Sequence, residues 1–103
     1  MKIKAIIKRP EDEYGRMTLI ENTLENLQMI VRGYIETTGI DNLVIICNEE
    51  GKLRGLEDNI RLGNDTLKGT IIICGASGDE FSDVPVTMQR WMEYIDKDSR
   101  IVG

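Results

Sequence analysis

The amino-acid sequence predicts a single α+β domain over residues 1–103, in which two principal helices cover a mainly antiparallel five-stranded sheet. Two apolar runs rich in β-branched residues, 43–47 and 70–74, are typical of buried central strands. Two other segments, 23–32 and 88–95, carry apolar residues at helical spacing. A chain of 103 residues is long enough for one core and too short for two.

Residues 2–20 are expected to form a β-hairpin. Apolar residues alternate with lysines over 2–8, which is the period-two pattern of a strand with one buried face. Pro10 ends this strand, and the polar segment 11–15 separates it from a second short strand at 17–20.

The first helix is predicted at 23–32. Asn22, followed three residues later by Glu25, has the form of a capping box, in which the two side chains satisfy free backbone N–H groups at the start of the helix. Gly33 then suits the left-handed position at which many helices end.

A second hairpin should join an extended segment at 34–37 to the apolar run 43–47, because turn-forming residues lie between them. The run 70–74 is the matching central strand of the same sheet, and the Gly- and Ser-rich segment 75–83 after it is expected to be a turn. The order is then ββαββ, a long connection, β and α. Neighbouring strands joined by short turns must be antiparallel.

The last helix is expected to begin near Pro85 or Thr87 and to present one apolar face. Met88, Trp91 and Ile95 define that face, and proline suits the first turn of a helix. The tail after the helix, 97–103, is expected to fray, because chain ends are poorly ordered unless something holds them.

Composition argues against several classes of function. The chain has no histidine, and its two cysteines, Cys47 and Cys74, lie 27 positions apart. This composition excludes a Cys/His zinc site, and the lack of histidine excludes a His-dependent triad. The formal net charge of −5 disfavours direct binding to nucleic acid. We therefore expect no catalytic residues, no metal, no cofactor and no membrane partner, with reduced cysteines in a cytoplasmic protein. The pattern does not specify an oligomeric state.

The connection 48–69 is the segment in which a functional surface is most expected, because connections of this length are uncommon in small domains. Two interpretations stay open. The segment is either a packed Ω-like loop with one helical turn at 56–60, or a surface that binds a protein partner. The candidate partner-binding residues are polar and charged, namely Glu49, Glu50, Lys52, Arg54, Glu57, Asp58, Asn59, Arg61 and Asp65.

Four segments carry a resemblance to a known family: MKIKAIIKRP, IENTLENLQMIVRGYIE, VIICNEEGKLRGLEDNIRLGND and GTIIICG. In these segments the chain resembles a family of small proteins that contain a domain of unknown function and occur in phages, plasmids and Firmicutes genomes. The most specific part of this resemblance is CNEEGKL, together with the Gly-Leu, Asn and Arg-Leu-Gly positions that follow it. The family offers no catalytic residues to carry over.

The resemblance implies a bacterial mobile-element protein, and the chain also looks like short inhibitors of type II CRISPR effectors. A Cas9-type effector or its guide complex is then the expected partner, because such effectors offer basic channels and arginines that read the PAM. The acids expected to make this contact are Glu49, Glu50, Glu57, Asp58 and Asp65. The alternatives are a phage or plasmid adaptor that uses the same connection, and a protein that sequesters a small nucleotide in a pocket beside the sheet.

Overall fold

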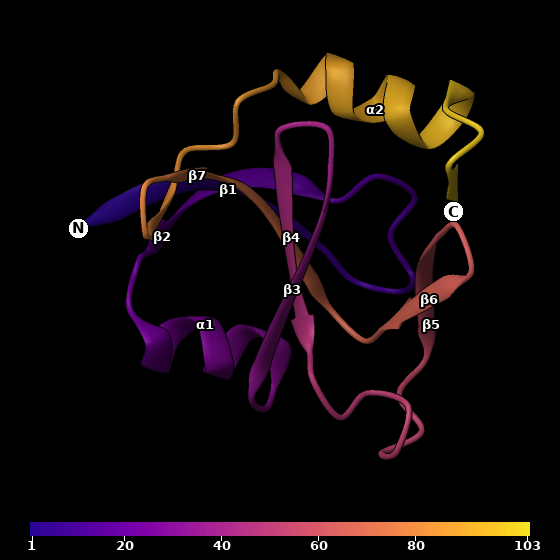
Figure 1. The fold of residues 1–103 in the computed structure, drawn as a ribbon, viewed down its shortest axis with the longest axis horizontal. Coiled ribbons are helices and arrows are strands. Elements are labelled where there is room, and N and C mark those ends of the chain that lie inside the picture. The colour runs from indigo at the N-terminus through magenta and orange to yellow at the C-terminus, as the bar shows by residue number, and fades with distance from the viewer.

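The computed structural model describes residues 1–103 and has the expected α+β fold (Figure 1). Two helices and nine strands follow one another along the chain. Their bounds are β1 Lys2–Lys8, β2 Arg16–Glu21, α1 Leu24–Val31, β3 Ile35–Ile40, β4 Leu43–Asn48, β5 Asp58–Leu62, β6 Asp65–Lys68, β7 Ile71–Ser77, β8 Glu80–Ser82, α2 Met88–Lys97 and β9 Ile101–Val102.

The main sheet has the strand order β2-β1-β7-β4-β3, and every neighbouring pair is antiparallel. The short strand β8 pairs with the end of β7. The two apolar runs lie side by side at the centre, with Val44 opposite Cys74 and Ile46 opposite Ile72. The predicted central strands and both predicted hairpins are therefore confirmed.

Different elements cover the two faces of this sheet, as Figure 1 shows with α1 and α2 on opposite sides. Leu27 and Val31 of α1 pack in a core of 8 buried residues on one face. Trp91 and Tyr94 of α2 pack in a core of 13 buried residues on the other face. That larger core also takes in Ile60, because the strands β6-β5-β9 form a small second sheet on the same side. Neither α1 nor α2 has the length and apolar composition of a membrane-spanning helix.

The two cysteines are free and buried, as predicted. Cys47 of β4 faces the core beneath α2, whereas Cys74 of β7 faces the core beneath α1. Because side chains alternate between the faces of a sheet, the two thiols point to opposite sides and cannot form a disulfide.

Helix α1 begins and ends differently from the prediction. Its N-cap is Thr23, whose Oγ1 accepts a hydrogen bond from the backbone N–H of Asn26 at 3.2 Å. Asn22, the residue expected to cap the helix, instead donates from Nδ2 to the carbonyl oxygen of Phe81 at 3.0 Å. Its side chain therefore contacts a distant strand. At the other end the left-handed residue is Arg32, with φ 64°, rather than Gly33.

The long connection contains a hairpin, and the helical turn expected at 56–60 is wrong. Strands β5 and β6 pair across Gly63 and Asn64, with Leu62 opposite Asp65. A two-residue Gly-Asn loop with positive φ at glycine is a common hairpin connection. Only the first part of the connection, between β4 and β5, is irregular.

The C-terminal tail is ordered, so the expected fraying is also wrong. Strand β9 pairs with β5, with Ile101 opposite Leu62, and the Ile101 side chain is buried in the larger core. One buried isoleucine and one pair of strands hold the chain end in place, which is the condition under which a terminus does not fray.

Candidate functional site

The chain after β4 forms a projecting turn, residues 49–55, whose start is fastened to the end of α1. Asn48 is buried, and its Nδ2 donates hydrogen bonds to the carbonyl oxygens of Val31 and Arg32 at 3.0 and 3.1 Å. Its Oδ1 accepts from the backbone N–H of Glu50 at 2.8 Å. One buried amide therefore joins the projecting turn to carbonyls at the helix C-terminus, which lack partners within the helix.

Arg54 holds the other end of the projecting turn. Its guanidinium donates to the carbonyl oxygen of Arg32, and its backbone N–H donates to the carbonyl oxygen of Glu50 at 2.9 Å. Gly33 allows this close packing, because a Cβ there would lie 2.6 Å from the Asn48 amide nitrogen and 2.9 Å from the Arg54 guanidinium. Contacts within the protein thus hold both ends of the projecting turn.

The projecting turn displays an apolar side chain, Leu53, between the exposed cations Lys52 and Arg54, and it begins with two carboxylates. Leu53 is 87% exposed, more than any other large hydrophobic side chain in the protein. Glu49 and Glu50 are exposed and form no ion pair within the chain. Tyr34, 65% exposed, lies beside them and accepts a backbone hydrogen bond from Glu49 at 2.9 Å.

The remaining predicted charges are partly neutralised by neighbours. Lys52 pairs with Asp65 at 2.9 Å, and Asp58 pairs with Lys68 at 2.5 Å. Glu57 is exposed and forms no ion pair within the chain. Of the five acids expected to contact a partner, Glu49, Glu50 and Glu57 therefore keep an uncompensated charge.

The prediction that Asn59 contacts a partner is wrong, because its side chain is buried and its hydrogen-bonding groups already have partners within the protein. Its Nδ2 donates to the carbonyl oxygens of Lys8 and Gly69 at 2.9 and 2.8 Å, and its Oδ1 accepts from the Lys8 ammonium at 2.8 Å. It joins β5 to β1 and cannot form part of a contact surface. Arg61 is exposed, but it lies opposite Val102 of β9 rather than on the projecting turn.

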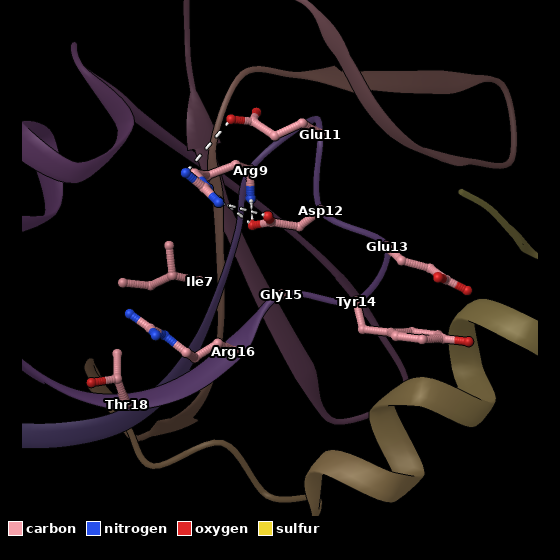
Figure 2. A pocket seen from close by; sticks show the side chains of 9 residues that line it. All are labelled: Ile7, Arg9, Glu11, Asp12, Glu13, Tyr14, Gly15, Arg16 and Thr18. Atoms are coloured by element: carbon pink, nitrogen blue, oxygen red, sulfur yellow. Dashed lines mark hydrogen bonds and ion pairs between the residues drawn. The ribbon is translucent and has the colours of Figure 1, made fainter.

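A hollow of about 700 Å³ lies beside the β1–β2 hairpin (Figure 2), and its residues were not among those predicted from the sequence. Gly15, with φ +85°, lets the hairpin close tightly, because a Cβ there would lie 2.5 Å from the carbonyl oxygen of Ile7. The hollow is lined by Ile7, Arg9, Glu11, Asp12, Glu13, Tyr14, Gly15, Arg16 and Thr18. The available signal was the pairing of Ile7 with Arg16, which places an arginine on a sheet face otherwise rich in apolar side chains.

A second hollow of about 430 Å³ adjoins the first, since Arg9 and Glu11 line both. It extends towards the end of α1 and the projecting turn, where Arg32 and Gly55 line it. The two hollows and the projecting turn therefore occupy neighbouring parts of the surface.

A family model described as "Domain of unknown function (DUF3846)" matches residues 1–96. The chain belongs to this family. No curated protein and no solved structure matches it. The family description names no activity.

The segment that matches the DUF3846 family contains the projecting turn and both hollows, whereas β9 lies outside it.

The segment that matches the family also contains both cysteines. Burial raises the pKa of the Cys47 thiol to about 11 and that of the Cys74 thiol to about 12. Neither is a thiolate at neutral pH, so neither supplies a nucleophile there.

Proposed function

We propose that this protein is encoded by a mobile element and inhibits a host defence system. It would do so by binding another protein through the projecting turn. The observation that carries the proposal is the exposure of Leu53 on a turn that Asn48 and Arg54 hold at both ends. A large apolar group on a pre-organised loop gains contact area on binding with little loss of conformational freedom.

The charge around Leu53 indicates the kind of partner. Glu49, Glu50 and Glu57 form no ion pair within the chain and outnumber Arg54, the cation of the projecting turn that also forms none, so a partner with a basic surface is favoured. Proteins that handle nucleic acid present such surfaces. Among defence systems, a Cas9-type effector has basic channels and PAM-reading arginines that these carboxylates could occupy. The type II CRISPR effector is therefore the first proposed target, in the bacterial cytoplasm.

The test is binding to, and inhibition of, a purified Cas9–guide complex. Leu53→Ala and the double variant Glu49→Lys/Glu50→Lys are each expected to weaken binding by about tenfold or more. The matched control is Asp79→Lys/Glu80→Lys, which reverses two adjacent exposed acids in the β7–β8 hairpin and changes the net charge equally.

The control is expected to bind as the unmodified protein does. If the unmodified protein neither binds the complex nor slows cleavage of target DNA, the proposed target is wrong. If it binds and both double variants lose affinity equally, only net charge matters, and the assignment of the contact to the projecting turn fails.

A further inference from the structure

The hollow beside the β1–β2 hairpin lies on the part of the sheet that α1 leaves uncovered. Ile3, Ala5 and Ile20 on this face are buried in the core with α1. Ile7 lies further along β1 on the same face and is only half-buried, opposite Arg16 of β2. Ile7 and Arg16 thus line the hollow side by side, one apolar and one cationic.

Internal contacts hold the Arg9 guanidinium in place at one side of this floor. Asp12 accepts hydrogen bonds from Nε of Arg9 at 3.2 Å, from its NH2 group at 3.0 Å and from its backbone N–H at 2.9 Å. Glu11 lies 3.6 Å from the same guanidinium. The hydrogen bonds from Arg9 hold the pKa of Asp12 below its usual range. Both carboxylates therefore contact Arg9, whose single positive charge offsets one of their two negative charges.

Arg16 is the cation of the hollow that has no internal partner. It is exposed and forms no ion pair, unlike Arg9. In Figure 2 the side chains of Ile7, Arg16 and Thr18 extend to the same side of the hairpin, whereas Glu13 and Tyr14 extend the other way, towards α2. Tyr14 donates a hydrogen bond to Asp96 of α2 at 2.9 Å, which keeps it on that side.

A further free arginine lines the adjoining hollow. Arg32 is exposed, forms no ion pair and has a left-handed backbone with φ 64°, a conformation that costs free energy for a residue with a side chain. Arg16 and Arg32, which form no ion pair, therefore line two hollows that share Arg9 and Glu11, on a protein whose net charge is −5.

We propose that this hollow binds a small phosphate ester of about mononucleotide size, with the phosphate on Arg16 and Thr18 and the flat apolar part over Ile7. A guanidinium is suited to two-point contact with phosphate oxygens. The volume of about 700 Å³ lies within the usual range for small-molecule sites, roughly 300–1,000 Å³. The site is separate from the projecting turn, so the inference does not depend on the proposed function.

Isothermal titration calorimetry with AMP, adenosine and inorganic phosphate tests the proposal on the full chain. AMP is expected to bind, and adenosine and phosphate to bind about tenfold more weakly or not at all. Arg16→Gln is expected to weaken AMP binding by about tenfold or more, because it removes the charge and the two-point contact. Thr18→Val, which keeps the side-chain shape, should weaken it less.

Arg61→Gln is the matched control, since Arg61 is also an exposed strand arginine without an ion pair and lies on the second sheet. It is expected to bind AMP as the unmodified protein does. The absence of any AMP binding would overturn the proposal, as would equal losses in Arg16→Gln and Arg61→Gln. Phosphate binding as tight as AMP binding would overturn the assignment of ligand size.

Discussion

The ammonium of Lys8 donates a hydrogen bond to Oδ1 of Asn59 at 2.8 Å, and Nδ2 of Asn59 donates back to the carbonyl oxygen of Lys8 at 2.9 Å. Both side chains are buried, with exposed fractions of 2% for Lys8 and 8% for Asn59. This reciprocal pair joins β1 of the main sheet to β5 of the second sheet.

Replacing Asn59 with alanine should destabilise the protein strongly, because it leaves a buried ammonium and two backbone carbonyls without their partner. The expected loss in the free energy of unfolding is about 2–4 kcal/mol. Urea denaturation measures it. Arg61→Ala on the same strand, at an exposed position, is the control and should change stability by no more than about 0.5 kcal/mol. An equally small effect of Asn59→Ala would show that the reciprocal pair contributes nothing.

Lys8 should make stability depend on alkaline pH. Burial lowers the pKa of Lys8 below 10.5, so the folded state holds its proton less tightly than the unfolded state does. Between the folded pKa and 10.5 the unfolded chain binds more protons, and the contribution of Lys8 to stability therefore rises with pH. We expect the stability of the unmodified protein, relative to that of Lys8→Met, to rise over this range. A difference that stays constant with pH would mean that burial does not shift the Lys8 pKa.

Deleting residues 99–103 should destabilise the protein, although a frayed tail would be dispensable. The deletion removes the Ile101 side chain from the larger core, which by itself should cost about 2–4 kcal/mol. Deletion of Gly103 alone, an exposed terminal residue, is the control and should have little effect. Thermal or urea unfolding distinguishes the two. Equal stability of both truncated proteins would mean that β9 does not hold the fold.

Arg100 should support stability at neutral pH and lose that effect in acid. Its guanidinium bonds to Asp98 at 2.7 Å and to Asp41 at 2.9 Å, which lowers the pKa of Asp98 to about 2 and that of Asp41 in the same direction. A carboxyl with a lowered folded pKa stabilises above its unfolded pKa of 3.8, and the stabilisation is lost as the pH falls towards about 2. The stability difference between the unmodified protein and Arg100→Gln should therefore shrink over that range. A difference that persists at about pH 2 would rule out this role.

Both thiols should be unreactive in the folded protein. Burial raises the pKa values of Cys47 and Cys74 to about 11 and about 12, and neither side chain is accessible. A colorimetric thiol reagent at about pH 8 should react slowly with the native protein and rapidly with both cysteines in concentrated urea. Fast reaction of one thiol in the native state would place that cysteine on the surface and contradict the structure.

The candidate site was only partly predictable from the sequence. The length of the connection after β4 was the reason to expect a functional surface there, which stays a prediction, and its irregular part is the projecting turn. Asn59 could not be assigned from the pattern, because an asparagine in a polar segment is equally compatible with a surface and with a buried hydrogen-bonding role. The hollow beside β1 and β2 was missed because its residues are brought together by strand pairing and by the limited extent of α1.

The sequence by itself determined the central strands, both hairpins and the two principal helices, because continuous β-branched runs and helical spacing of apolar residues are local signals that agree with the final core. Only the tertiary structure decided the roles of Asn22, Asn48 and Asn59 and the order of the C-terminal tail. The reason is that a polar side chain satisfies whichever backbone groups the packed fold leaves unpaired, and those groups come from segments distant in the sequence.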